Sequence, residues 1–213
     1  MRKLFLSVSS GLLLAFSWPE IGVFPILLFA FVPLLMLEDD LQKFEDNRKG
    51  KKVFWFSFIA FFIFNTITTY WVYYPTLFGV IAAVLVNATL MATSFYLFHK
   101  IKSATTTRLG YLAFIVFWIS MEYLHLNWDL SWPWLTLGNS FANSPYVVQW
   151  YEITGFLGGS LWVLLMNILF FRVVKKQNLK AILLPFLLLF MPILTSYYLI
   201  PEIKEEKQLK VLI

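Results

Sequence analysis

The sequence contains no cysteine. The 213 residues therefore cannot by themselves form a disulfide, a cysteine-ligated metal site or a thiol nucleophile. There are only two histidines, His99 and His125, too few for the usual ligand set of a zinc site. The sequence also has no phosphate-binding loop, dinucleotide-binding fingerprint or serine triad, so we expect no metal and no cofactor.

Charge is also scarce. Only 14% of the residues are charged, whereas soluble domains carry about 25%. Hydrophobic residues make up 60% of the chain, and the mean hydropathy is +0.72. These values exclude a water-soluble globular domain, and the apolar content excludes a disordered chain.

The sequence instead contains long apolar runs. A helix needs about 20 mostly apolar residues to cross a membrane. The sequence therefore predicts an all-α polytopic membrane protein with about seven transmembrane helices in residues 1–200, at roughly 3–17, 21–37, 53–74, 76–98, 109–126, 149–171 and 181–200. The first run resembles a signal peptide but lacks a small-x-small cleavage site, so we expect it to be retained.

Basic residues are concentrated in alternate loops. With the N-terminus on the cytoplasmic side, 14 of the 17 lysines and arginines lie on that side. This asymmetry predicts a cytoplasmic N-terminus and an extracytoplasmic C-terminus. It also explains the net charge of +5 without a nucleic-acid partner.

The segment 127–148 is the longest predicted outer loop, and it has no lysine or arginine. It is apolar and rich in tryptophan and proline, so we expect it to fold into the membrane surface and to suit acyl chains. An ordinary aromatic belt at the interface is the alternative.

Two acids, Glu122 and Glu152, lie near the outer ends of the flanking spans. Either could contact a cationic or amine headgroup, or be a hydrogen-bonded acid at a helix end. His125 follows Glu122 by three residues, which favours a structural hydrogen bond between them over a catalytic pair.

Small and polar residues inside the spans suggest helix packing. Gly155 and Gly159 have the spacing that lets two helices approach closely. Asn65 and Asn87 lie near mid-depth on either side of a predicted hairpin, and we predict a hydrogen bond between them.

The order of the motifs resembles the membrane half of bacterial apolipoprotein N-acyltransferases. The resemblance covers essentially the whole chain and rests on a Trp-Pro turn, a Tyr-Trp pair, Trp-x-x-x-Glu, Pro-Trp-x-x-x-Gly and Gln-x-x-Glu-x-Thr-Gly. In this sequence these are Trp18-Pro19, Tyr70-Trp71, Trp118 to Glu122, Pro133 to Gly138, and Gln149 to Gly155. The family often has arginine where this chain has His125, which is a departure from its pattern.

The resemblance implies acyl transfer from a phospholipid, through an enzyme cysteine, to the N-terminal amine of a diacylglyceryl-cysteine lipoprotein. It implies a bacterial inner membrane location with the functional face towards the periplasm. It also implies a nitrilase-like domain with a Glu–Lys–Cys triad, of which residues 201–213 would be the beginning. The chain would then be a truncated enzyme, inactive alone. The expected lipid or substrate contacts are Trp71, Glu122, His125, Trp132, Pro133, Trp134, Gly138, Asn139, Gln149 and Glu152.

Two other functions remain open from the sequence. A small transporter or channel component would need a polar path from face to face and an internal repeat. The only repetition is Ser-Trp-Pro at 17–19 and 131–133, and it is short. The other alternative is a non-enzymatic membrane scaffold.

Overall fold

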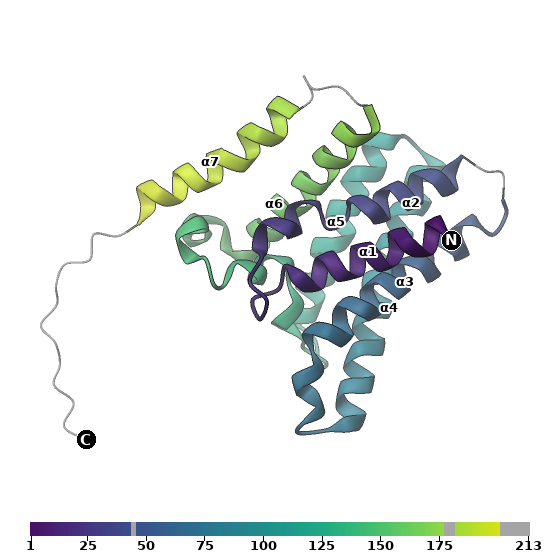
Figure 1. Ribbon diagram of the computed structural model, residues 1–213, viewed down its shortest axis with the longest axis horizontal. Helices are drawn as coiled ribbons and strands as arrows, with labels where there is room; N and C mark the ends of the chain where they lie inside the picture. Colours follow the sequence, from purple (N-terminus) through teal and green to yellow (C-terminus); the bar gives the residue numbers. More distant parts are fainter. Residues whose placement is uncertain (44–45, 177–181, 201–213) are drawn as a thin grey trace, which may run out of the picture.

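The protein is seen here as a computed structural model that describes residues 1–43, 46–176 and 182–200. These residues form seven α-helices, five short 3-10 helices and no strand (Figure 1), which confirms the all-α class. The helices are α1 (Arg2–Phe16), α2 (Val32–Gln42), α3 (Lys49–Thr68), α4 (Leu77–Ala104), α5 (Thr107–Leu126), α6 (Tyr151–Lys176) and α7 (Leu183–Leu199). The 3-10 helices are η1 (Phe24–Phe29), η2 (Tyr70–Tyr73), η3 (Pro133–Leu135), η4 (Leu137–Phe141) and η5 (Pro145–Val147).

Four of these helices, α3 to α6, are long and apolar enough to cross a membrane. α7 is strongly apolar but has 17 residues, and α1 and α2 have 15 and 11. The chain is therefore a polytopic membrane protein in which shorter helices accompany four full-length ones. The predicted start of an additional domain at 201–213 lies outside the described residues.

The predicted span 21–37 is not one continuous helix. It is divided into η1 and α2, each with a proline at its start, Pro25 and Pro33. Proline fits the first turn of a helix because the backbone N–H it lacks would be unpaired there. The break is hydrogen-bonded by Asn167 of α6, whose Oδ1 accepts from the Phe31 N–H at 2.7 Å and whose Nδ2 donates to the Leu27 carbonyl at 2.8 Å.

Aromatic side chains fill the centre of the bundle. Phe31, Phe61, Phe114 and Trp118 are completely buried, and the Phe31 and Trp118 rings meet edge to face with centroids 4.9 Å apart. Such pairs add about 0.5–1.5 kcal/mol to the effect of burial. They join η1–α2 to α3 and α5.

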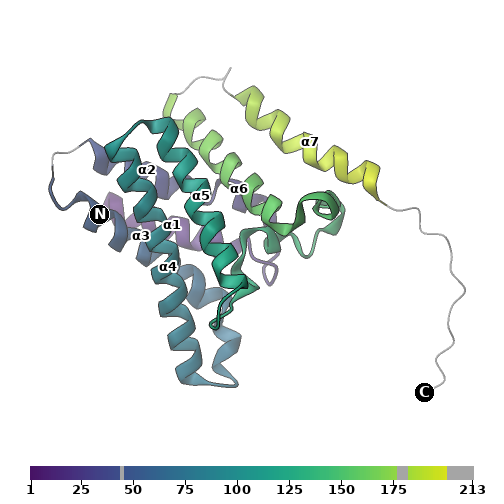
Figure 2. The same ribbon diagram turned by 180° about the vertical axis from the view of Figure 1, so that it is seen from behind.

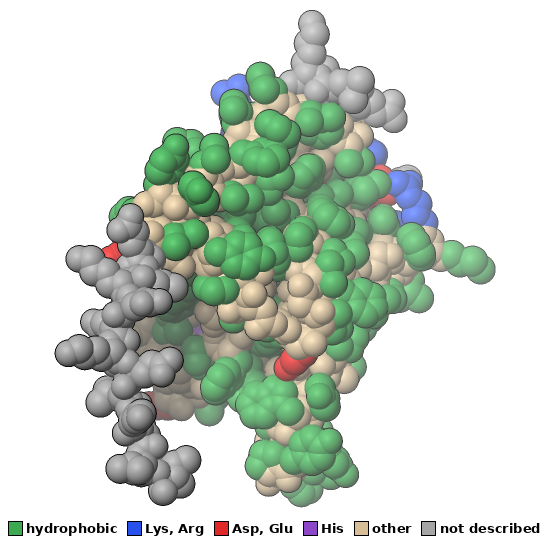
Figure 3. Space-filling view, turned by 60° about the vertical axis from the view of Figure 1, so that its left-hand side comes forward, with side chains coloured by type: hydrophobic (Ala, Val, Ile, Leu, Met, Phe, Trp, Pro, Cys, Tyr) green, Lys and Arg blue, Asp and Glu red, His purple; other side chains and the backbone are tan. Residues whose placement is uncertain are grey.

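The α3–α4 hairpin projects beyond the rest of the bundle, as the two opposite views agree (Figures 1 and 2). Its tip carries exposed aromatic side chains, among them Tyr74 and Phe78, which are 80% and 84% exposed. Figure 3 shows a face dominated by hydrophobic side chains, with lysine and arginine visible only near its upper and right margins. Exposed apolar surface on this scale suits contact with lipid.

Candidate functional site

The segment between α5 and α6 folds back over the bundle through η3, η4 and η5. We call the side of the molecule formed by this segment, residues 127–150, the loop end. Glu122 anchors the segment, because its buried Oε1 accepts hydrogen bonds from Trp118 Nε1 and from the Leu137 N–H, both at 2.9 Å. Glu122 is thus held inside the protein through Oε1, while its buried Oε2 has no hydrogen-bond partner among the described residues, and its contact with a headgroup stays a prediction.

Gly138 lets the same segment lie directly on α6. Its N–H donates to Ser160 Oγ at 3.1 Å, and its carbonyl accepts from the Tyr151 hydroxyl at 3.0 Å. A Cβ at Gly138 would collide with the backbone carbonyl of Phe156. A side chain is therefore excluded here by neighbouring backbone.

We expect Gly138→Ala to lower the free energy of unfolding by about 1–3 kcal/mol, the usual cost of overpacking. The measurement is chemical unfolding in detergent micelles, followed by far-UV circular dichroism. Gly50→Ala is the control, because its Cβ would meet only the ring of Tyr96, at 3.1 Å, and a side chain can yield. Equal losses in the two variants would contradict the backbone clash.

His125 does not bond to Glu122, so the predicted pair is wrong. Both of its ring nitrogens are buried without a hydrogen-bond partner among the described residues, and the side chain is 5% exposed. The ring instead faces a cleft of about 260 Å³ between α4 and the loop end. The lining residues are Gly79, Ala82, Ala83, Val86, Asn87, His125, Leu130, Ser131 and Trp132.

Two further buried donors line this cleft. Asn87 Nδ2 and Trp132 Nε1 have no hydrogen-bond partner in the described part of the chain. Buried polar groups are almost always paired, and each unpaired one costs about 1–3 kcal/mol. Unpaired donors on an otherwise apolar wall are what a binding site for an acceptor-rich amphipathic molecule requires.

Tryptophans connect the projecting hairpin to the loop end. The rings of Trp71 and Trp132 lie nearly parallel with centroids 6.5 Å apart, and Trp134 meets Trp71 edge to face at 5.8 Å. Trp71 and Trp134 are 38% and 57% exposed. The structure therefore places these three predicted residues side by side, next to the cleft.

The remaining predicted site residues lie outside the cleft lining. Asn139 Nδ2 donates to the Pro133 carbonyl at 2.9 Å, and Gln149 Nε2 donates to the Pro145 carbonyl at 3.0 Å, so both amides brace local turns. Glu152 is exposed in the first turn of α6.

The predicted hydrogen bond between Asn65 and Asn87 is also wrong, whereas helix packing at Gly155 and Gly159, within the chain or between chains, stays a prediction. Asn65 Nδ2 donates to the Phe61 carbonyl of its own helix at 2.8 Å and to Met91 Sδ of α4 at 3.5 Å, and not to Asn87. Gly155 has φ of 66° and breaks α6, and a Cβ there would meet no atom within 4 Å. A Cβ at Gly159 would meet the Tyr151 ring, which belongs to the turn before the break and not to a second helix.

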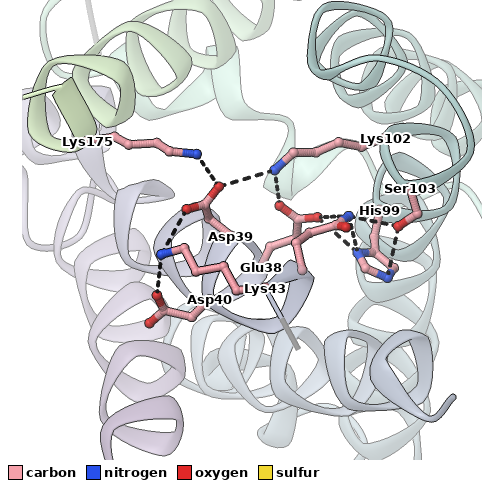
Figure 4. Close-up of polar contacts among 9 residues, drawn as sticks. Glu38, Asp39, Asp40, Lys43, His99, Lys102, Ser103 and Lys175 are labelled. Atoms are coloured by element: carbon pink, nitrogen blue, oxygen red, sulfur yellow. Dashed lines mark hydrogen bonds and ion pairs between the residues drawn. The ribbon is translucent and has the colours of Figure 1, made fainter. Parts of the chain in front are cut away.

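A polar cluster that sequence reasoning missed lies at the opposite side, which we call the basic end (Figure 4). Glu38 of α2 is completely buried and forms an ion pair with Lys102 of α4. Its Oε1 also lies 2.9 Å from His99 Nδ1. The run Glu38-Asp39-Asp40 at the end of an apolar segment was a signal for it, since carboxylates at membrane depth need partners.

Comparisons with known proteins identify the family of the chain. Residues 10–169 match the family described as apolipoprotein N-acyltransferase N-terminal domain. A protein of Chlorobaculum tepidum named apolipoprotein N-acyltransferase is 32% identical over 171 residues, which are 79% of this chain and 31% of that protein. One of the same name from Geobacter metallireducens is 26% identical over 183 residues, 82% of this chain and 34% of that protein. The chain thus spans about a third of the length of these relatives, and it belongs to the apolipoprotein N-acyltransferase N-terminal domain family.

Proposed function

We propose that this chain is the membrane domain of an apolipoprotein N-acyltransferase. The complete enzyme would move an acyl chain from a phospholipid to the N-terminal amine of a diacylglyceryl-cysteine lipoprotein. Family membership supports this assignment. The concentration of basic residues away from the loop end supports an inner-membrane protein whose loop end faces the periplasm.

The proposed chemistry needs a thiol that these 213 residues do not supply. A thiolate would attack the phospholipid ester carbonyl, form a thioester and release a lysophospholipid. The lipoprotein amine would then attack the thioester, form the amide and regenerate the thiol. We assign both steps to polypeptide outside this chain and assign lipid binding to the chain itself.

The loop-end cleft is the observation that carries the lipid-binding role. A phospholipid offers ester and phosphate oxygens, which accept hydrogen bonds, next to apolar acyl chains. Asn87 Nδ2, Trp132 Nε1 and one N–H of a neutral His125 are donors, and the other lining residues are largely apolar. We propose that these three residues hold the polar end of the lipid while its acyl chain follows the apolar wall.

A chimera tests the proposal. Residues of this chain replace the matching segment of the Chlorobaculum tepidum relative, and lipoprotein N-acylation is followed by the mass of the N-terminal lipopeptide. A hydrogen bond to a charged group contributes about 1.5–3 kcal/mol. We therefore expect His125→Ala and Asn87→Ala each to lower the rate about 10- to 150-fold.

Asn127→Ala is the matched control, because Asn127 is exposed and its side chain, among the described residues, bonds only to the Tyr123 carbonyl, outside the cleft lining. It should acylate like the unmodified chimera. An inactive but folded chimera would contradict the function. An active chimera in which both cleft variants keep full activity would contradict the role of the cleft alone.

A further inference from the structure

A larger cavity lies at the basic end, between the start of α3 and the end of α4. Its volume is about 950 Å³. It is separate from the loop-end cleft and shares no lining residue with it. The function proposed above makes no use of it.

The cavity wall is strongly cationic. Arg48, Lys49, Lys51 and Lys100 line it, and none of them forms an ion pair with another described residue. The one lining acid, Asp46, is occupied: it pairs with Lys52 and accepts the Arg48 backbone N–H at 2.7 Å. The hydrogen bond from Lys52 lowers the pKa of that carboxyl below its usual value, so Asp46 stays ionised and paired. Among the described residues, four positive charges therefore face one cavity without forming an ion pair, and Asp46 is near enough to Arg48 for a Coulombic attraction.

The floor of the cavity is polar, with a buried histidine and an exposed serine. His99 lines it and is 1% exposed, with its orientation fixed by Nδ1 at 2.9 Å from Glu38 Oε1. Ser103 also lines it, with its Oγ 3.5 Å from His99 Nε2 and bonded to Gln42 Nε2 at 2.7 Å. The hydrogen bonds that hold His99 and Ser103 in place distinguish the cavity from a row of surface lysines.

Aromatic residues indicate the depth of the cavity in the membrane. Trp55 lies one turn of α3 beyond Lys51 and is 60% exposed, and the half-buried Tyr96 lines the cavity. Tryptophan and tyrosine favour the headgroup level. Gly50 keeps the space open, because a Cβ there would come within 3.1 Å of the Tyr96 ring.

We propose that this cavity binds the headgroup of an anionic phospholipid. The phosphate oxygens contact the lysine ammonium groups, and the acyl chains run along the exposed apolar side chains of α3, which include Trp55 and Phe62. Four unpaired cations and a cavity of this size favour a headgroup with two phosphates over one with a single phosphate. Basic pockets between membrane helices are a general form of such sites.

The test uses the 213-residue chain in nanodiscs of dioleoylphosphatidylcholine with a minor fraction of tetraoleoyl cardiolipin. Retained lipid is counted by native mass spectrometry as the cardiolipin fraction is varied. Each cation near the surface contributes about a fivefold change in affinity, so Lys49→Gln with Lys51→Gln should weaken binding about 30-fold. Arg108→Gln with Arg172→Gln removes the same charge from another pocket at the basic end and should change binding less than about threefold.

Gly50→Leu provides a test without any change of charge. It fills the cavity and should weaken binding at least as much as one lysine replacement, about fivefold. Circular dichroism confirms that each variant remains helical, and the two lysine replacements keep the test valid if Gly50→Leu does not fold. Equal losses in the two double variants, or full binding by a folded Gly50→Leu, would overturn the site. Displacement of cardiolipin by millimolar inorganic phosphate would show that a free anion and not a lipid is the ligand.

Discussion

Replacing Lys102 by methionine is expected to lower the free energy of unfolding by about 3–5 kcal/mol. The side chains of Lys102 and Glu38 are 7% and 0% exposed, so the substitution leaves a carboxylate inside the protein with only His99 and Gln42 beside it. Removing one partner of a buried pair has this cost because the remaining charge cannot regain its water. The measurement is chemical unfolding in detergent micelles, followed by circular dichroism.

The double variant Glu38→Leu with Lys102→Met shows whether such a loss comes from the uncompensated Glu38 charge or from the loss of the ion pair itself. If the uncompensated charge is responsible, the double variant should recover a large part of the stability, because the buried Glu38 carboxylate is removed together with its partner and Asp39 keeps its ion pair with Lys175. Lys43→Met serves as the control: Lys43 pairs with Asp39 and Asp40 but is 62% exposed, and we expect it to change the stability far less than Lys102→Met does. A double variant less stable than Lys102→Met would contradict this interpretation.

Glu122→Leu is expected to lower the free energy of unfolding by about 2–4 kcal/mol. It would leave two buried donors, Trp118 Nε1 and the Leu137 N–H, without an acceptor, and each costs about 1–3 kcal/mol. Because the second donor belongs to η4, the segment between α5 and α6 should also become more open to proteolysis.

Glu122→Gln should cost less than about 1 kcal/mol, since its side-chain oxygen can still accept both hydrogen bonds. Glu152→Gln controls for charge removal, because Glu152 is exposed, and it should leave stability unchanged. The measurement is the midpoint of denaturant unfolding together with the rate of limited proteolysis. A Glu122→Gln variant as unstable as Glu122→Leu would mean that Glu122 acts through its charge and not through these two hydrogen bonds.

Much of the fold follows from apolar runs of sufficient length, and α3 to α6 lie close to where the sequence predicts them. The interruption between η1 and α2 was readable from Pro25 and Pro33, but continuous hydrophobicity concealed it. Hydropathy reports how much of a segment is apolar. It does not report whether the backbone within the segment is continuous.

The site was predicted less well because its contacts depend on rotation about helix axes and on distant partners. Asn65 and Asn87 lie at similar depth, yet no apolar pattern indicates which way each amide points in a span that is hydrophobic on all sides. Of the predicted lipid or substrate contacts, His125 and Trp132 line the cleft, and their role in binding stays a prediction. The hydrogen bond between Glu122 and the Leu137 N–H, fifteen residues later, could not be predicted from the sequence, because it depends on how the segment between them folds.

The bonds from Asn167 to the break before α2 also affect how the protein is made. Asn167 accepts a hydrogen bond from the Phe31 N–H, and it lies 136 residues further along the chain. At about 5–20 residues synthesised per second, the ribosome reaches it about 7 to 27 s later. During that interval the open backbone must be shielded by the translocation machinery or by lipid headgroups. The segment that forms η1 and α2 is thus synthesised well before the residue that completes its hydrogen bonds.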